Sequence, residues 1–287
     1  MKVRQYITAM LALATVSCTE ELSLPAEPEV DNGPTTMLTV SVSQPSFEGY
    51  ASEAFTWGED CIGVYGSAQG VNERYLPLES DAEGRTTFYG EAVAGRLQLY
   101  FPYAAAGNAT LLAGRLPIPA EQQYYASPYD HLRHNVQMAA ATNTTEATFE
   151  YHTGIIKLQL MLDATAVEQV RVTVQNNTAG NNDHLAGDIA LQGDLEPRVV
   201  NGSGSVTLYG IGRQSASEDA PLTLWIAAAE GTYDNLVVTI SSAEGSVNKP
   251  VRGPFIVERA AATTVEVRET NYNYGIGDFG SKPGEFE

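Results

Sequence analysis

The chain has few cysteines, few basic residues and no long apolar segment. Two cysteines, Cys18 and Cys61, occur in 287 residues, which excludes a framework of several disulfides. Sixteen Lys and Arg stand against 35 Asp and Glu, for a formal net charge of −19. Because this charge repels nucleic acids and anionic lipid surfaces, neither is an expected partner. The apolar run of residues 7–16 is too short for a membrane-spanning helix, which takes about 20 residues.

Motifs for catalysis are also missing. The sequence contains no Gly-x-Ser-x-Gly nucleophile turn, no phosphate-binding loop and no Cys-x-x-Cys pair. His131 and His134 are three residues apart, which could place two metal ligands on one helical face. Spacing points to no third ligand, so we expect neither a metal nor a cofactor. A hydrolase with paired carboxylates stays an alternative, since spacing alone does not reveal such a pair among 35 acidic residues.

Residues 1–17 have the form of an export signal, with a basic start, a short apolar core and small residues at the end. The segment "TVSC" that ends at Cys18 resembles the lipoprotein box of bacteria, in which the cysteine is acylated and the chain is cut just before it. The resemblance implies a lipid anchor at Cys18, followed by a polar linker over residues 18–36. The alternative is a plain signal peptide with an incidental cysteine. With Cys18 acylated, Cys61 would have no disulfide partner.

Alternation of apolar and polar residues runs through most of the remaining chain and predicts β-strands with one buried face. Clusters of Gly, Pro and Asn separate these strands. A short helix or an irregular crossing is expected only in residues 129–141. The inward stripes predict the following buried residues: Leu38, Val40, Val42, Leu158, Leu160, Val172 and Val238.

The spacing of these strands predicts an all-β protein built from sandwiches. The length that follows the signal favours two domains, and the Thr- and Asn-rich segment "AATNTTEAT" suggests a boundary near residue 148. We therefore expect an N-terminal sandwich over residues 37–148 and a C-terminal sandwich over residues 149–270. A tail over residues 271–287 follows.

The two tryptophans have different expected environments. Trp57 is expected to fill a sandwich core. Trp225 lies off the face that carries Leu222, Leu224 and Ile226, so it is expected at a domain interface or on the surface. Exposed aromatic rings could stack on sugars, which keeps a glycan-binding surface lipoprotein as the alternative function.

Several short segments resemble, in their order, those of the fimbrillin-like family, the subunits of type V pili. "FTWGEDCIGVYG" resembles the family's W-x-x-G-D-x-I-G-V-Y segment, and "LPIPAEQQYYASPYDHL" resembles its I-P-x-x-Q segment followed by an aspartate. "FEYHTGIIKLQLML" is similar to its F-x-H strand, with one extra residue between Phe149 and His152. "RGPFIVERAAATTVEVRE" resembles the closing pair of strands. The resemblance covers about residues 37–270.

Within these segments we expect folding roles rather than catalytic ones. Asp60 is expected to accept backbone N–H bonds at a turn. Gly58 and Gly63 permit unusual or closely packed backbone. Pro102 is expected to end the preceding strand or to lie at a sheet edge.

The resemblance implies two transthyretin-like Greek-key β-sandwich domains in tandem, a lipoprotein of the outer membrane and cell surface, and no enzymatic activity. It implies assembly into a fimbrium with other pilin subunits and a role in adhesion to a host or bacterial surface ligand. In polymerising members a protease removes the first strand, and an extended strand of a neighbour takes its place by strand addition.

Stalk subunits of the best-known type are cut after an arginine in the loop that follows the first strand. This chain has no Arg or Lys from Thr19 to Glu73, and Arg74 is the first. We therefore expect no activation by a trypsin-like cut. Either a protease of another preference acts, or the strand is kept and the subunit ends a filament at its base.

Alternation returns in the tail, where Tyr272, Tyr274 and Ile276 face one side. Three large alternate side chains suit a donor strand that inserts into a neighbour's groove. The alternative is a disordered or locally docked terminus, as is common at chain ends.

Overall fold

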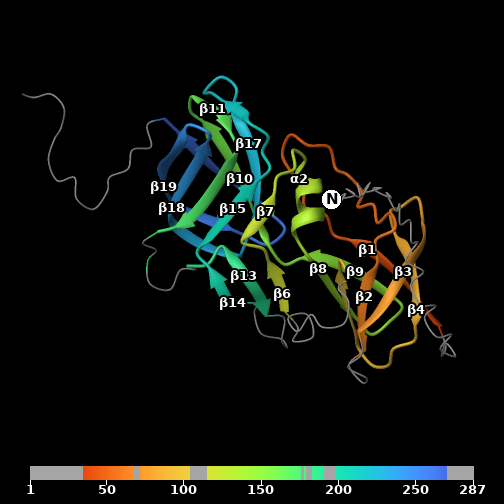
Figure 1. Cartoon of the computed structure of the whole chain (residues 1–287). Helices are drawn as coiled ribbons and strands as arrows, with labels where there is room; N and C mark the ends of the chain where they lie inside the picture. The colour runs from red at the N-terminus through yellow and green to blue at the C-terminus, as the bar shows by residue number, and fades with distance from the viewer. Residues whose placement is uncertain are drawn as a thin grey trace, which may run out of the picture. The chain divides into compact units, whose positions relative to one another are not determined.

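The computed structural model describes residues 35–66, 72–103, 115–175, 178, 183–190 and 198–269. In this part of the chain nearly all regular structure is β-strand, with a single α-helix (Figure 1). The all-β class that alternation predicted is therefore confirmed. No helix of the described residues is long and apolar enough to span a membrane. Cys18, Tyr272, Tyr274 and Ile276 lie outside the described residues, so the predictions for them stay predictions.

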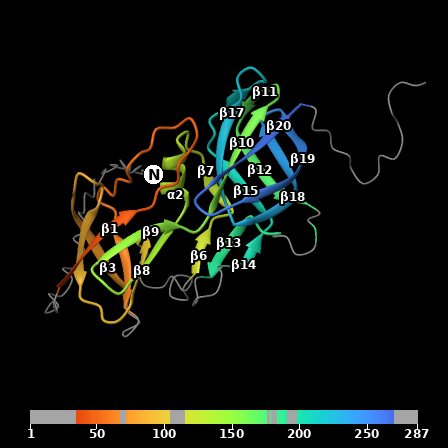
Figure 2. The same ribbon diagram turned by 180° about the vertical axis from the view of Figure 1, so that it is seen from behind.

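Seven strands form a closed barrel in the order β1-β4-β3-β2-β5-β8-β9. Figure 2 labels β1, β3, β8 and β9 of this barrel. Their bounds are β1 (Thr35–Val42), β2 (Ile62–Gly66), β3 (Asn72–Ser80), β4 (Thr86–Glu91), β5 (Leu97–Phe101), β8 (Met138–Thr142) and β9 (Glu146–Tyr151). Pairing of β2 with β3 and of β8 with β9 closes the ring. Closure leaves no free sheet edge in this part of the fold. β5 ends at Phe101, directly before Pro102, as predicted.

The other strands form four sheets, in the orders β17-β10-β20, β11-β16, β19-β18-β12-β15-β7 and β14-β13-β6. The early members are β6 (Arg115–Ile118), β7 (Glu121–Gln123), β10 (Gly154–Met161), β11 (Ala164–Val167), β12 (Gln169–Val174), β13 (Ala186–Ala190) and β14 (Arg198–Ser203). The later members are β15 (Ser205–Tyr209), β16 (Gln214–Ala216), β17 (Leu222–Ala228), β18 (Gly231–Ser242), β19 (Gly245–Val257) and β20 (Ala262–Arg268).

The helix, α2 (Pro128–Asn135), begins and ends with standard signals. The Ser127 hydroxyl caps its N-terminus by accepting the Asp130 N–H, and Pro128 occupies the first turn, where its missing N–H costs nothing. Arg133 and His134 lie in the last turn, where cations are favoured. The helix covers only the first part of the segment in which a short helix was expected, and β8 occupies the rest.

Two strands that precede residue 148 pair with strands that follow it. β6 pairs with β13, and β7 pairs in parallel with β15. β9, which contains residue 148, pairs with β1 inside the barrel. The chain therefore leaves the barrel for the later sheets at β6 and β7, and returns to complete the barrel with β8 and β9. A division into two domains near residue 148 stays a prediction.

The buried apolar residues form two clusters. Leu158, Leu160, Val172 and Val238 lie in the cluster of the later sheets, and Leu38 and Val40 lie in the barrel cluster; all six are fully buried. The inward stripes therefore identified the core. Val42 is the exception, because it is half-buried at the end of β1 and only packs against the barrel cluster.

Candidate functional site

β1 is the strand that completes the barrel between β4 and β9. It runs antiparallel to β4, with Leu38 opposite Phe88, and parallel to β9, with Val42 opposite Phe149. The Ser43 N–H also donates to the carbonyl of Phe149 at 2.9 Å. Since both edges of β1 are hydrogen-bonded, its removal would expose the backbone groups of two neighbouring strands.

The inner face of β1 packs in the apolar core of the barrel. Leu38 and Val40 have no exposed surface and belong to one cluster with Trp57, Phe88 and Phe149. Full burial of a Leu or Val side chain stabilises a fold by about 1.5–3 kcal/mol relative to exposure. β1 is therefore an integral part of the barrel core as well as of its hydrogen bonding.

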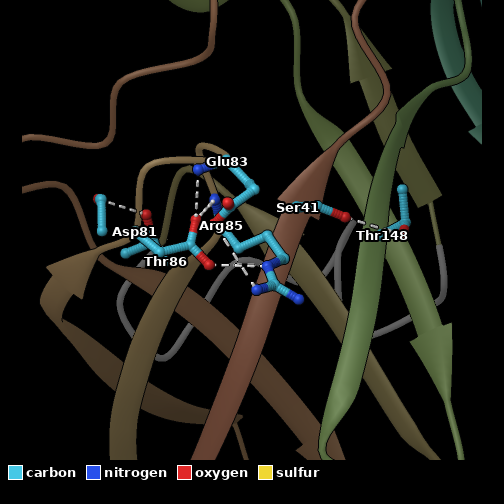
Figure 3. Close-up of polar contacts among 7 residues, drawn as sticks. Ser41, Asp81, Glu83, Arg85, Thr86 and Thr148 are labelled. Atoms are coloured by element: carbon cyan, nitrogen blue, oxygen red, sulfur yellow. Dashed lines mark hydrogen bonds and ion pairs between the residues drawn. The ribbon is translucent and has the colours of Figure 1, made fainter.

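The outer face of β1 makes polar contacts instead (Figure 3). The hydroxyls of Ser41 on β1 and Thr148 on β9 are hydrogen-bonded at 3.0 Å. In the neighbouring β3–β4 turn, the Asp81 carboxylate accepts the backbone N–H groups of Glu83 and Arg85 and the Arg85 side chain at 2.7 Å. These contacts lie in exposed surroundings, so they contribute to the register of the strands more than to stability.

Two aromatic residues that follow β1, Phe47 and Tyr50, pack against Trp225 on β17. The ring of Trp225 lies 5.2 Å from Phe47 and 5.3 Å from Tyr50, both edge-on. Its indole N–H donates to the carbonyl of Ala126 at 3.3 Å. Trp225 is 1% exposed and belongs to the barrel cluster although β17 pairs with β10. The expectation of an exposed Trp225 is therefore wrong, and its place at a domain interface stays a prediction.

Trp57 is buried in an aromatic group of the barrel. Its ring makes edge-on contacts with Phe55, Phe88 and Phe101, between 4.7 and 5.1 Å from centroid to centroid. The expected core position of Trp57 is confirmed.

Arg133 of α2 holds the turn that precedes β2. Its guanidinium donates to the carbonyl and hydroxyl of Thr56, to the carbonyl of Trp57 and, at 2.7 Å, to the carboxylate of Asp60. Asp60 was expected to accept backbone N–H groups, and this expectation was wrong, because the donor to its carboxylate is the side chain of Arg133. Its carboxylate is bonded by a distant arginine, and its own N–H donates to Trp57 in the turn. Gly58 fits this turn because its φ is +60°, which side chains disfavour.

A buried polar network joins α2, β7 and β17. The Gln122 side chain bonds both backbone groups of Ala227, donating to its carbonyl at 2.8 Å and accepting its N–H at 2.9 Å. The same Gln122 oxygen accepts from His131 Nε2 at 3.0 Å. Asn135 bonds both backbone groups of Gln123, at 2.7 and 2.8 Å. The neighbouring elements β7 and α2 are thus joined to the distant strand β17, and both polar atoms of the Gln122 side chain are hydrogen-bonded.

His131 takes part in this network as a neutral ring. Nε2 faces an oxygen that only accepts, so it carries the proton, and Nδ1 accepts from Asn135 at 3.2 Å. Burial lowers the pKa of His131 to about 3. His134, the other candidate metal ligand, stacks on Tyr125 at 4.3 Å and donates from Nδ1 to the carbonyl of Asp130. The two histidines therefore have separate partners, and the described residues contain no group of three or more His, Cys, Asp or Glu that could hold a metal.

The sequence reasoning missed Gln122 and Asn135 as joining residues. A signal existed for Gln122, because it is the glutamine of the "IPAEQ" segment. Asn135 carried none, since an asparagine at the end of a helix is common and its partner is known only once β7 is placed.

Cys61 and Arg74 interact across β2 and β3. Cys61 is buried and not in a disulfide, and its sulfur accepts from Arg74 Nε at 3.2 Å. Arg74 lies within β3, opposite Gly63. The first basic residue after the N-terminal region is therefore in a paired strand rather than a loop.

Aromatic residues do not form an exposed platform in the described part of the chain. Of its large exposed hydrophobic residues, Tyr50 and Tyr209 are the aromatic ones, and Tyr50 packs edge-on against the buried Trp225. No observation therefore favours the glycan-binding alternative.

A cavity of about 410 Å³ lies in the later sheets. Apolar side chains such as Leu162 and Ile240 form part of its wall, and Asp163 and Glu244 also line it. Lys249 at its wall bonds both the carbonyl and the carboxylate of Glu269 at 3.0 Å. This bonding satisfies the buried lysine within the fold, and it gives no positive indication of a hydrolase.

No protein-family model and no curated protein matches the chain. Among solved structures, it is similar to a candidate cell adhesion protein from Bacteroides ovatus, with a TM-score of 0.48, 12% identity, and coverage of 81% of this chain and 91% of that one. A fimbrial assembly protein from Parabacteroides distasonis has a TM-score of 0.40, 8% identity, and coverage of 81% and 91%. The tip fimbrial protein Mfa3 from Porphyromonas gingivalis, truncated at its C-terminus, has a TM-score of 0.32, 12% identity, and coverage of 76% and 82%.

Proposed function

We propose that this protein is a structural subunit of a surface fimbrium, anchored by lipid at Cys18 and joined to other subunits by strand addition. The observation that carries the proposal is the place of β1. The first strand of the fold packs in the apolar core and pairs on both edges. Its removal would open a groove in which an incoming strand could replace its hydrogen bonds and its side chains together. The ordered segments that resemble the fimbrillin-like family support the same reading.

The finer parts of the proposal follow from the resemblance. The seven-stranded barrel and the group of four other sheets correspond to tandem transthyretin-like Greek-key domains. The subunit resides at the outer membrane, contributes to adhesion and catalyses no reaction. Its C-terminal segment, with Tyr272, Tyr274 and Ile276, acts as the donor strand for a neighbouring subunit.

Activation by a trypsin-like protease is not part of this proposal. A cut after Arg74 would separate β1, β2 and the start of β3 from the rest of the barrel. Removal of that much of the core would unfold the barrel rather than open one groove. A protease of another preference therefore releases β1, or β1 is retained and the subunit lies at the base of the filament.

Electron microscopy of cells with and without the gene tests the role in a fimbrium. Deletion should remove surface filaments or detach them from the cell, and restoration of the gene should reverse the defect. Unchanged, firmly attached filaments would contradict the proposal. N-terminal sequencing of the protein purified from the cell surface tests the processing, because a start at Tyr75 would mean that Arg74 is used.

A further inference from the structure

The groove that removal of β1 would open has a restricted size at two positions. Leu38 and Val40 are both fully buried, in one cluster with Trp57, Phe88 and Phe149. Protein cores are packed as densely as organic crystals, so a side chain much larger than Leu or Val enters only by displacing its neighbours. A strand that replaces β1 therefore needs aliphatic side chains at two positions that are two residues apart.

The C-terminal segment of this same chain does not meet that requirement. Ile276 is its single aliphatic residue among positions 271–287. The residues two positions away are Tyr274 and Asp278. Every register, in either direction, thus puts an aromatic, polar or glycine residue in place of Leu38 or Val40. A ring at these positions overfills the groove, and a carboxylate there is buried without a partner.

The N-terminal segment offers Leu22 and Leu24 at the right spacing, but its neighbours do not fit. In the direction of β1, Pro25 takes the place of Ser41. Alternate residues of β1 point their N–H groups toward β9, and Ser41 lies between two of them, Thr39 and Ser43. A proline at this position has no N–H to donate. In the opposite direction, Glu20 takes the half-buried place of Val42.

We infer that the β1 groove accepts a strand of a different subunit, with branched aliphatic side chains at the two central inward positions, and that copies of this chain do not link to one another. The inference rests on the proposed strand addition and adds the chemical nature of the partner strand. It applies to the form from which β1 has been released, because a retained β1 is paired on both edges and keeps out every incoming strand.

The test uses the full chain with a site-specific protease sequence inserted after Ala51, within the exposed residues 48–54. The cut protein is refolded from urea with a fluorescent peptide of residues 35–51, and unlabelled peptides compete for the groove. Residues 271–287 provide a second peptide of the same length, and residues 19–34 provide a third. The control peptides exchange the deciding side chains: residues 271–287 with Tyr272→Leu and Tyr274→Val, and residues 35–51 with Leu38→Tyr and Val40→Tyr.

The peptide of residues 35–51 should compete at the lowest concentration. The peptide of residues 271–287 should need a concentration about 100-fold higher or more. The peptide of residues 271–287 with Tyr272→Leu and Tyr274→Val should compete at a much lower concentration than the unchanged tail peptide. The peptide of residues 35–51 with Leu38→Tyr and Val40→Tyr should need a much higher concentration than the unchanged β1 peptide. Equal competition by residues 271–287 or by residues 19–34 would overturn the selectivity alone. Failure of the labelled peptide to bind at all would overturn strand addition and, with it, this inference.

Discussion

The side chain of Gln122 pairs with the backbone of Ala227 as a neighbouring strand would, through bonds of 2.8 and 2.9 Å to its carbonyl and N–H. The two residues are 105 positions apart, and both are fully buried. The amide thereby continues the hydrogen bonding of β17 on the edge where none of the described strands pairs with it. His131 completes the arrangement from α2.

Replacement of Gln122 by Leu should lower the free energy of unfolding by about 2–4 kcal/mol, because it leaves both backbone groups of Ala227 and one nitrogen of His131 buried and unpaired. Urea denaturation measures the change. Gln98→Leu, at an exposed position of β5, is the matched control and should change stability by about 0.5 kcal/mol or less. Similar values for the two variants would contradict the role assigned to Gln122.

Stability should fall below pH 6.5 because of His131. The pKa of this residue in the fold, about 3, lies below the ordinary value of about 6.5, so the unfolded chain takes up the proton first. The stabilisation is complete above pH 6.5 and is lost as the pH falls toward 3. Between pH 7 and pH 5 the loss from this group is about 2 kcal/mol.

Urea denaturation of the wild type and of His131→Gln at both pH values isolates this contribution. The variant should lose about 2 kcal/mol less than the wild type between pH 7 and pH 5. Gln98→Leu, at an exposed position of β5, is the control and should keep the pH dependence of the wild type. An equal pH dependence in His131→Gln would show that this histidine is not the cause.

Replacement of Arg133 should lower the stability of the fold more than replacement of its ionic partner, Asp60. Arg133→Met removes all the bonds to the turn at residues 56–60 and should destabilise the protein by about 1–3 kcal/mol. Asp60→Asn removes one charge whose side chain is 47% exposed, and should cost about 1 kcal/mol or less. Chemical denaturation compares the two variants. A larger loss for Asp60→Asn would mean that the ion pair, and not the backbone contacts, holds the turn.

Leu158→Ala should destabilise the protein by about 2–5 kcal/mol, because β10 is hydrogen-bonded to β17 and β20 on its two sides and the side chain is fully buried. Gln159→Ala, on the opposite face of the same strand, should cost less than about 1 kcal/mol. Thermal or urea unfolding of the two variants checks the inward stripe. Equal costs would contradict it.

Cells fed a fatty-acid analogue should label the wild-type protein and not Cys18→Ser, because only the cysteine after the export signal is expected to be acylated. Cys61→Ser is the control and should label normally. Labelling of Cys18→Ser at the wild-type level would exclude the anchor at this position.

The amino-acid sequence by itself determined which residues enter the core. Alternation along β1, β10, β12 and β18 is a local property, since each side chain's face follows from the strand geometry alone. For this reason Leu158 and Val238 were identified as buried without knowledge of their neighbours. Val42 differs because burial at the end of a strand depends on what lies beyond that strand.

Only the tertiary structure decided which strands meet and which polar groups join them. The short strands β6 and β7 pair with β13 and β15, and no local pattern specifies a partner so distant in the chain. Trp225 could equally have been exposed until Phe47 was placed against it. In the sequence, Gln122 was not singled out, His131 was considered as a metal ligand, and Asp60 was expected at a turn. Their roles depend on hydrogen-bond partners 105, 9 and 73 positions away, which folding brings within 3 Å and which composition and periodicity do not encode.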